Sequence, residues 1–403
     1  MKLAIIKERK NPPDRRVVFS PQACADLLKE FPELEIKVES SDIRVFTDEA
    51  YKNKGITVTN DVSDCDVMLG VKEVPIGALI PNKKYFYFSH TIKKQPYNRE
   101  LLRAMLEKNI EMYDHESIVD NKNRRVVAFG RYAGIVGAYN GFRTYGLKYD
   151  LFNLPKAENL NSQQDLINEL IAIKDKLPNI KIVLTGKGRV SNGAKEMLDS
   201  MGLTEVSPQD FKTQNYNETV YTQLDVLDYN VRKDGKVIDK YDFYNHPQEY
   251  KSIFFDYAKV ADFYISGHFY GVGSPYIFTR KDAKKPEFKI KVVADVSCDI
   301  DGPVACTIRP STIAEPIYGY DPISEKEIDF KDENAIAVMA VDNLPCELPN
   351  DASIGFGKMF AKYVIPAFFN NDKDGVLERA RMTQNGKLTK RFAYLQDYVD
   401  GKE

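Results

Sequence analysis

The stretch KIVLTGKGRVSNGAKEMLD, residues 181–199, constrains the fold of this chain more than any other. Ile182 to Leu184 form a short apolar run typical of a buried parallel strand, and apolar residues recur at helical spacing from Ala194 to Leu198. Three glycines lie between these two segments. A strand, a glycine turn and a helix in this order predict an α/β domain of the doubly wound type.

The glycine turn also predicts a ligand. Gly186 can take the backbone angles of a tight turn, Gly188 lets the backbone approach a pyrophosphate, and the first N–H groups of the helix face that anion. Ser191 stands where the usual G-x-G-x-x-G pattern has its third glycine. A glycine turn without a ligand is the alternative, but the flanking strand and helix favour a dinucleotide. We expect Arg189, Val190 and Ser191 to line that site.

The residues beyond the turn bear on the choice between NAD(H) and NADP(H). An NAD site usually has an acid on the ribose about 20 residues after the turn. That count from Gly186 ends at Val206 and Ser207, and neither is a carboxylate, although Glu205 and Asp210 lie on either side. The missing acid favours NADP(H) weakly, without an evident arginine for the 2′-phosphate. Ser207 is therefore the residue that we expect to bear on cofactor choice.

Length and charge limit the class of protein. A chain of 403 residues is too long for one ordinary core, so two α/β domains are expected. The 57 lysines and arginines against 59 acids give a net charge of −2, which offers no basic field for nucleic acid or an anionic membrane. No apolar run approaches the ~18 residues of a membrane span. The apolar stretch in the first ten residues, MKLAIIKERK, is too short for a signal peptide. We expect a cytoplasmic protein with small-molecule partners.

The five cysteines indicate neither a metal site nor a disulfide framework. They are scattered and odd in number, without the paired spacing of zinc ligands. Cys298 and Cys306 lie near the expected cofactor edge, but a buried thiol is favoured over a reactive one. We therefore expect reduced structural thiols and no metal.

Charged residues follow three expected strands at the point where each strand ends. Lys72 and Glu73 follow the apolar run 66–71, His90 follows the strand 85–88, and Glu116 lies in the charged group after the strand 110–113. Because the carboxyl ends of parallel strands meet at one edge of a sheet, these groups should converge there. An ordinary surface ion pair is the alternative for Lys72 and Glu73. A structural role is the alternative for His90.

An arginine-bearing loop follows the first strand, Leu3 to Ile6. Arg15 and Arg16 lie in it, just before a helix that we expect to begin with Ser20 as the N-cap and Pro21 as its first residue. A guanidinium at a strand end suits a substrate carboxylate by its two-pronged geometry. A solvated basic loop is the alternative.

The remaining segments complete the expected organisation. Residues 124–150 contain closely spaced small residues and predict a long linking helix, and the tyrosine-rich segment 216–246 resembles an insertion in the nucleotide domain. The strand 263–266 leads to Gly267, and a later strand ends at Asp295 and Val296. Both ends are expected to border the nicotinamide. A strand at 336–341 and a helix at 351–368 close the chain.

Seven motifs in order along nearly the whole chain resemble one family. They are Arg16 before VVFSP, LGVKEVP at 69–75, FSHTIK at 88–93, RRVVAFGRYAG at 124–134, GKGRVSNGA, ADVSCD and VDNLPCELP. Together they closely resemble the lysine–2-oxoglutarate reductase domain, the saccharopine-forming half of a bifunctional lysine-degrading enzyme. The lysine-forming saccharopine dehydrogenases of fungi share this layout, as do alanine dehydrogenase and the transhydrogenase-like superfamily more distantly.

The resemblance implies a reaction and the residues for it. The reaction is the reversible reductive condensation of L-lysine with 2-oxoglutarate to saccharopine, using a reduced nicotinamide cofactor. Lys72 and His90 match the family's acid–base pair, with Glu73 and Glu116 beside them. Two such groups are needed, because amine addition requires removal of a proton and water departure requires supply of one. The carboxylate-binding positions matched are Arg16 and one or both of Arg124 and Arg125, and Arg131, which falls where the family varies, is added to them.

The resemblance also implies the domain plan. Two Rossmann-like domains with parallel sheets and a cleft between them are expected. The substrate domain would contain residues 1–140 and 335–403, because the tail returns to it, and the cofactor domain residues 141–334. The chain ends where the bifunctional enzyme would continue into its second half, which predicts a stand-alone reductase. A homo-oligomer is a possible assembly.

Two other functions stay open at this point. An alanine or opine-type dehydrogenase would use the same layout with another amine and keto acid. A nucleotide-binding regulator would keep the fold without catalysis, although the retained lysine and histidine argue against it.

Overall fold

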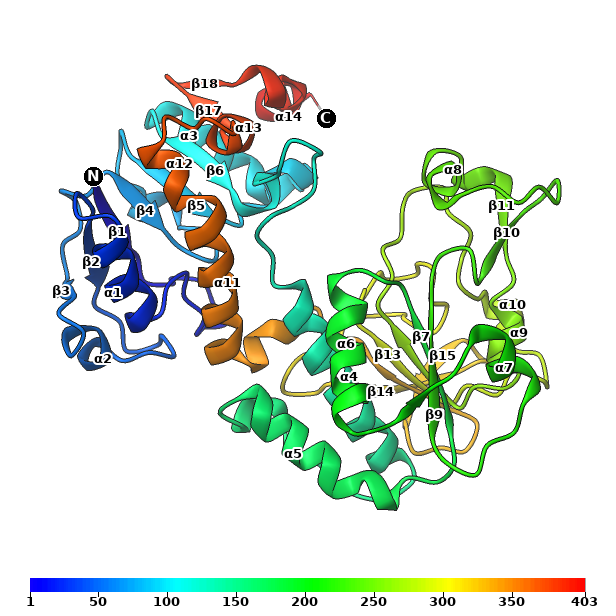
Figure 1. Ribbon diagram of the computed structural model, residues 1–403. Helices are drawn as coiled ribbons and strands as arrows, with labels where there is room; N and C mark the ends of the chain where they lie inside the picture. The colour runs from blue at the N-terminus through cyan, green and yellow to red at the C-terminus, as the bar shows by residue number, and fades with distance from the viewer. Residues whose placement is uncertain (403) are drawn as a thin grey trace. The chain divides into compact units, whose positions relative to one another are not determined.

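The computed structural model describes residues 1–402, which form two compact units. Unit 1 contains residues 1–129 and the segment that begins at Pro349, and unit 2 contains Gly130–Leu348. Figure 1 shows the blue start and the orange-red end of the chain in the same unit. The predicted α/β class, with a first domain completed by the C-terminal segment, is confirmed.

Unit 1 is built on a six-stranded sheet in which every neighbouring pair is parallel, in the order β3-β2-β1-β4-β5-β6. Its strands are β1 (Lys2–Ile5), β2 (Glu35–Glu39), β3 (Thr57–Thr59), β4 (Val67–Leu69), β5 (Lys84–Tyr87) and β6 (Glu111–Asp114), with a hairpin of β17 (Thr383–Gln384) and β18 (Lys387–Leu388). The helices are α1 (Pro21–Glu30), α2 (Asp48–Lys52), α3 (Arg99–Glu107), α11 (Pro349–Tyr363), α12 (Ile365–Phe369), α13 (Val376–Ala380) and α14 (Gln396–Asp400).

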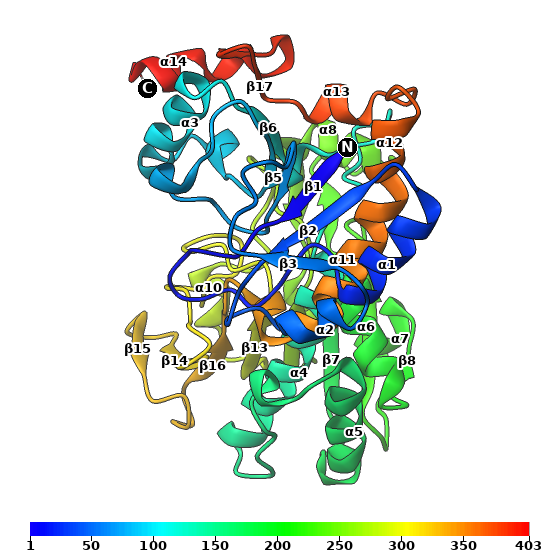
Figure 2. The same ribbon diagram turned by 90° about the vertical axis from the view of Figure 1, so that its left-hand side faces the viewer.

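The C-terminal segment packs against helix α1 through its helix α11. Ser20 caps helix α1 as predicted, because its side chain accepts the N–H of Ala23 at 3.2 Å. Helix α11 lies beside α1 (Figure 2), and its Ser353 hydroxyl accepts the N–H of Val17 at 3.0 Å. The closing helix predicted over 351–368 is interrupted at Val364, since Pro366 lacks the N–H that would continue α11.

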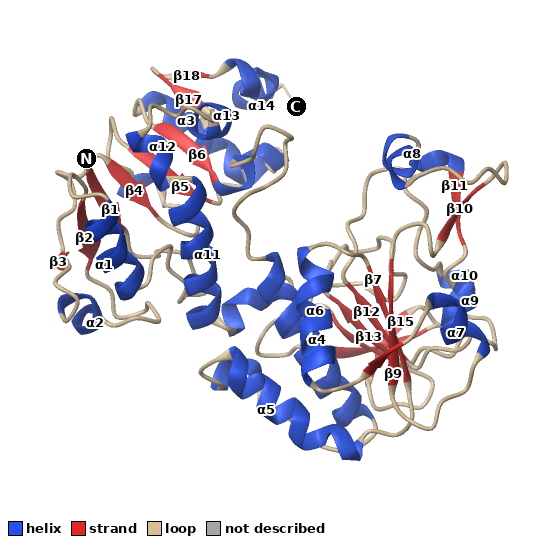
Figure 3. Cartoon of the chain, viewed as in Figure 1, coloured by secondary structure: helices blue, strands red, loops and turns tan. Residues whose placement is uncertain are grey.

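Unit 2 is built on an eight-stranded sheet in the order β15-β14-β16-β13-β12-β7-β9-β8, shown in red in Figure 3. Its strands are β7 (Lys181–Thr185), β8 (Thr204–Glu205), β9 (Val220–Leu224), β12 (Phe263–Ser266), β13 (Val292–Asp295), β14 (Ile317–Asp321), β15 (Lys326–Ile328) and β16 (Ile336–Met339), with a separate pair β10 (Asn230–Arg232) and β11 (Tyr250–Ser252). The helices are α4 (Gly130–Lys148), α5 (Gln163–Ile173), α6 (Arg189–Ser200), α7 (Pro208–Thr213), α8 (Lys240–Asn245), α9 (Phe255–Ala258) and α10 (Arg280–Ala283).

The sheet of unit 2 is mixed rather than wholly parallel. The strands from β8 to β16 along the sheet are parallel, whereas β14 runs antiparallel to β16, and β15 antiparallel to β14. This antiparallel edge was not expected. The short connection between β14 and β15 allows a hairpin but no crossover helix.

The units divide at residues 129 and 349, where the sequence suggested 140 and 335. Helix α4 is continuous from Gly130 and packs on α6, and β16 lies inside the sheet of unit 2, so both belong to that unit. The contact between α4 and α6 is at backbone distance. A Cβ at Gly134 would lie 1.8 Å from the Val190 carbonyl oxygen, and one at Gly193 would lie 2.0 Å from that of Arg131.

The segment 216–246 is only in part an insertion. Its residues Val220–Leu224 form β9, which is wholly buried and pairs with β7. The rest supplies β10 and α8, which together with β11 lie outside the large sheet. The sequence VYTQL carries two polar residues, and these obscured a core strand.

None of the helices in residues 1–402 combines the length and the apolar character that a membrane crossing requires. Across the same residues, histidine, cysteine, aspartate and glutamate side chains form no group of three or more that could hold a metal ion. All five cysteines are free thiols.

Candidate active site

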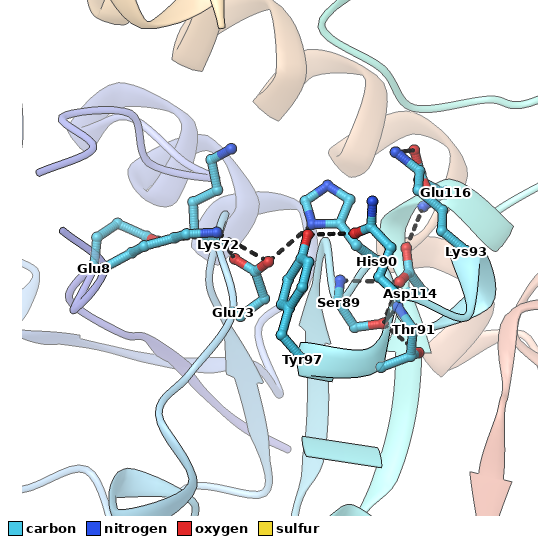
Figure 4. Close-up of polar contacts among 12 residues, drawn as sticks. Glu8, Lys72, Glu73, Ser89, His90, Thr91, Lys93, Tyr97, Asp114 and Glu116 are labelled. Atoms are coloured by element: carbon cyan, nitrogen blue, oxygen red, sulfur yellow. Dashed lines mark hydrogen bonds and ion pairs between the residues drawn. The ribbon is translucent and has the colours of Figure 1, made fainter. Parts of the chain in front are cut away.

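The carboxyl ends of β4, β5 and β6 bring the predicted charged residues of unit 1 together (Figure 4). Lys72 follows β4, where its backbone N–H donates to Glu8 Oε2 at 2.8 Å. The N–H of Val71 donates to the other oxygen of the same carboxyl at 2.7 Å. Glu8 follows the neighbouring strand β1, so its carboxyl fixes the backbone from which the Lys72 side chain projects. Burial raises the pKa of Glu8 to about 8.

Glu73 lies between Lys72 and the ring of His90 in Figure 4. Its Oε1 lies 2.9 Å from His90 Nδ1, and Lys10 Nζ is 2.9 Å from Oε2. Burial raises the pKa of this carboxyl, but the hydrogen bonds from His90 and Lys10 outweigh burial and lower the pKa to about 2. Glu73 is therefore a permanent anion at neutral pH.

His90 is held in an unusual backbone conformation. Its φ of 56° lies in the left-handed region, directly after Ser89 and before Thr91. The preceding residue is fixed, because the Ser89 N–H donates to Asp114 Oδ2 at 2.9 Å and its hydroxyl lies 2.8 Å from Thr91 Oγ1. With Nδ1 donating to Glu73, the Nε2 atom of the ring is the position that can exchange a proton with a substrate.

The third strand end serves two purposes. Asp114 is wholly buried and accepts the backbone N–H groups of Ser89 and Glu116, so it ties the end of β6 to that of β5. Glu116 in turn lies 3.8 Å from both Lys93 Nζ and Arg125 Nη1. Glu116 thus has two cationic neighbours at the end of β6.

His115 lies at the same strand end but is part of the hydrophobic core. Its Nε2 is 2.9 Å from the Gly70 carbonyl oxygen, and its ring packs against Phe88, Phe356 and Phe360. Complete burial lowers the pKa of His115 to about 3. The ring is a neutral core group.

The four predicted carboxylate-binding arginines lie in different surroundings. Arg16 is buried, pairs with Asp14 through Nε and Nη2 at 3.0 and 2.6 Å, and stacks over Phe129. Arg125 lies at the site through Glu116, with its guanidinium 5.8 Å from the centre of the Phe88 ring. Arg124 is largely exposed and pairs with Asp120 in a loop. Arg131 belongs to unit 2 and pairs with Glu196 of α6.

The glycine turn of unit 2 has the geometry predicted for its first glycine. Gly186 has a φ of 94°, and a Cβ there would lie 2.8 Å from the Gly267 carbonyl oxygen. Ser191 replaces the third glycine, and its hydroxyl donates back to the Gly186 carbonyl. Gln223 of β9 closes the turn, because its amide nitrogen lies 3.1 Å from the Gly186 oxygen and 2.9 Å from Ser191 Oγ.

The outer part of the turn fits a pyrophosphate. A Cβ at Gly188 would meet nothing within 4 Å, so this backbone faces open space. Gly188 is also the N-cap of α6, and no side chain caps this helix. An uncapped helix N-terminus of 12 residues beside open glycine backbone offers donors and a positive dipole end to an anion. Arg189 and Val190 form the first turn of that helix.

The other predicted cofactor positions have structural partners. Asp295 is buried at the end of β13 and accepts the hydroxyls of Ser266 and Thr307 at 2.7 and 2.6 Å. A Cβ at Gly137 of α4 would lie 2.4 Å from Val296 Cγ2, so Val296 packs directly against this helix. Ser207 caps α7, a role described further below.

Several site residues were not predicted. Glu8, Lys10 and Asp14 contact predicted site residues directly, and all three come from the loop after β1. The signal for them was their position beyond a strand end, in the uniformly polar stretch KERKNPPDRR. Gln223 was missed together with its strand.

Comparison with known proteins supports the α/β fold. Residues 4–136 match the family model described as alanine dehydrogenase/PNT, N-terminal domain. The whole-chain fold is similar to an L-alanine dehydrogenase, with a TM-score of 0.65 and 15% identity over 100% of both chains. It is also similar to the transhydrogenase from Sinorhizobium meliloti, with a TM-score of 0.58 and 14% identity over 96% of this chain and 100% of that chain.

Curated relatives bear out the resemblance to the saccharopine branch. The chain is 28% identical over 450 residues to the mitochondrial alpha-aminoadipic semialdehyde synthase of Mus musculus, covering 100% of this chain and 48% of the relative. The chain therefore spans about half the length of this relative. It is 24% identical to the saccharopine dehydrogenase [NAD(+), L-lysine-forming] of Yarrowia lipolytica, covering 89% of this chain and 90% of the relative.

Proposed function

We propose that this chain is an oxidoreductase that forms or cleaves saccharopine by reductive condensation of L-lysine with 2-oxoglutarate. The observation that carries the proposal is the trio Lys72, Glu73 and His90 at neighbouring strand ends, with Glu73 and His90 2.9 Å apart. Supporting it are relatives of matching length whose name gives L-lysine as product and NAD+ as cofactor.

The reaction needs proton transfer at two points. Addition of the lysine side-chain amine to the keto carbon requires the amine to lose its proton, and departure of the carbinolamine oxygen as water requires a proton to be supplied. We assign these transfers to His90, through Nε2, and to Lys72. The ionised Glu73 stabilises the cationic form of either partner and holds the His90 ring in one orientation.

The carboxylates of the substrates need cationic partners. Arg125, with Glu116 and Lys93 nearby, is the arginine whose position in the site best supports a contact with a substrate carboxylate. Arg16 is a second candidate, with Asp14 orienting its guanidinium and Phe129 below it. Arg124 and Arg131 have less support, because each is paired away from the strand ends.

The glycine turn of unit 2 fits the pyrophosphate of a nicotinamide dinucleotide, through the open backbone at Gly188 and the uncapped start of α6. When bound, this cofactor supplies or accepts the hydride. In our proposal the turn binds and orients, and all proton transfer belongs to residues of unit 1.

The test is an assay of NADH or NADPH oxidation with defined partners. We expect oxidation that requires both L-lysine and 2-oxoglutarate and that yields saccharopine by mass spectrometry. Oxidation with pyruvate and ammonia, or with another amino acid and keto acid, would replace this function by that of an alanine or opine-type dehydrogenase. Tight dinucleotide binding without turnover of any such pair of substrates would instead indicate a nucleotide-binding regulator.

A further inference from the structure

The order of strands in unit 2 changes which residue lies beside the dinucleotide turn. In a standard Rossmann sheet the next strand in sequence is also the next strand in space, so counting about 20 residues finds the ribose-binding acid. Here β9 lies between β7 and β8. The strand that follows β7 in sequence is therefore not its neighbour in space, and the count of about 20 residues does not find the residue beside the turn.

Strand β8 ends short of the ligand edge. It pairs with the beginning of β9, through Thr204 with Val220 and Glu205 with Tyr221, and the N–H of Val206 still donates to Tyr221. Ser207 then caps α7, since its hydroxyl accepts the N–H of Asp210 at 3.1 Å and donates to the Asp210 carboxylate at 2.7 Å. Ser207 therefore lies beside the start of β9 and already has a structural role.

Strand β9 reaches the ligand edge together with β7. Its last residue Leu224 is the register partner of Thr185, and the Gly186 N–H donates to the Leu224 carbonyl at 2.8 Å. Gln223 contacts the turn from the same strand. Asp225 is thus the first residue beyond the strand that adjoins the glycine turn, the place where a Rossmann sheet puts its ribose-binding acid.

The surroundings of Asp225 keep its carboxylate in a defined place. Its backbone N–H donates to Asp228 Oδ2 at 2.6 Å, and its Oδ1 accepts the N–H of Val226 at 2.8 Å. The Asp225 side chain is 35% exposed, and its charge partner Lys240 lies 3.9 Å away with a side chain that is itself 48% exposed. So weak a pair leaves the carboxylate able to accept hydrogen bonds from a ligand.

We propose that Asp225 binds the adenosine ribose hydroxyls and selects NAD(H) over NADP(H). A carboxylate accepts hydrogen bonds from two vicinal hydroxyls, whereas a 2′-phosphate in the same place would meet like charge. This inference rests on the proposed function for the presence of a dinucleotide. It reverses the preference for NADP(H) that the sequence count favoured.

The experiment is a direct titration of the full chain with NADH and with NADPH, without substrates, followed by calorimetry or nicotinamide fluorescence. We expect NADH to bind at least about 10-fold more tightly than NADPH, a difference of about 1.4 kcal/mol. Asp225→Ser should reduce the NADH/NADPH affinity ratio at least about 10-fold, because it removes the charge and leaves room for a phosphate. Asp225→Asn tests the charge alone in a side chain of the same shape.

Glu205→Gln is the matched control, because Glu205 is the acid at the end of β8, next to the position where the count along the sequence ends. Its affinity ratio should equal that of the parent chain. Equal or tighter binding of NADPH by the parent would overturn the assignment and move the choice to the turn's own cations, Lys187 and Arg189. An unchanged ratio in both Asp225 variants would also overturn it. Binding of neither dinucleotide would overturn the proposed function with it, so the two failures are distinguishable.

Discussion

The strand ends of unit 1 and the glycine turn of unit 2 both lie at the carboxyl edge of parallel strands, but they present different chemical groups there. In unit 1 the edge carries charged side chains held by one another, as Glu73 is held by His90 and Lys10. In unit 2 it presents open backbone at Gly188 and the uncapped start of α6. Substitutions in unit 1 should therefore act by removing a functional group. Substitutions at the turn of unit 2 should act by adding side-chain volume.

The largest effect should follow removal of the proton-transfer groups of unit 1. Lys72→Met and His90→Gln should each lower kcat by about 10²–10⁴-fold, the usual contribution of a positioned acid or base. Dinucleotide affinity should stay unchanged, since the turn lies in the other unit. Steady-state kinetics and a binding titration measure the two quantities.

Lys29→Met is the matched control for the lysine variant, because Lys29 lies exposed in the last turn of α1. It should retain the parent kcat. Near-normal turnover in both Lys72→Met and His90→Gln would show that the acid–base assignment is wrong.

The opposite pattern is expected at the turn. Gly188→Ala adds a methyl group into open space, so the melting temperature should not change. The same methyl group would keep a pyrophosphate from the backbone, and the Kd for the dinucleotide should rise about 10-fold or more. Differential scanning fluorimetry and calorimetric titration check the two halves. A lower melting temperature with unchanged Kd would contradict this reading of the turn.

The contrast between the units also explains what the sequence could predict. Lys72, Glu73 and His90 were predicted to lie at one edge of the sheet because each follows an apolar run, and the carboxyl ends of parallel strands share an edge whatever the strand order. Glu8 and Lys10 were not found, because their partners depend on β1 lying beside β4 in the sheet. Nothing in KERKNPPDRR distinguishes the residues that turn toward Lys72 and Glu73 from those that face solvent.

The same limit applies more strongly in unit 2. The motif predicted β7, Gly186 and α6, since local pattern alone specifies a strand, a turn and a helix. The neighbour of β7 was not predictable in this way. Strand β9 reads VYTQL within a polar, tyrosine-rich segment, and its place between β7 and β8 is decided by tertiary pairing. The expectation for Ser207 depended on that neighbour.

Packing between α4 and α6 gives a third effect, which falls on stability rather than on binding. Gly134→Ala would place a Cβ 1.8 Å from the Val190 carbonyl, which α6 can relieve only by moving. Overpacking of this kind typically costs about 1–3 kcal/mol of unfolding free energy. Gly77→Ala, where a Cβ meets nothing within 4 Å, should be close to neutral. Urea unfolding of the two variants tests the difference, and equal midpoints would contradict the close contact of α4 with α6.

The smallest effect separates two histidines that follow neighbouring strands of unit 1. His90 is the histidine to which we assign proton transfer, whereas His115 is buried and its pKa is lowered by burial to about 3. The folded chain keeps His115 neutral down to that pH, while the unfolded chain protonates it below about 6.5. Its contribution to stability is therefore complete above pH 6.5 and is lost as the pH falls from 6.5 toward 3.

His115→Leu should remove this pH dependence, which amounts to at most about 1.4 kcal/mol per pH unit for one proton. Unfolding free energies at pH 7, 6 and 5 should fall less steeply for the variant than for the parent, even though the lost bond to Gly70 lowers stability overall by about 1 kcal/mol. An identical slope in parent and His115→Leu would mean that His115 takes up a proton in the folded chain. Burial would then not distinguish His115 from His90, although the two histidines follow neighbouring strands.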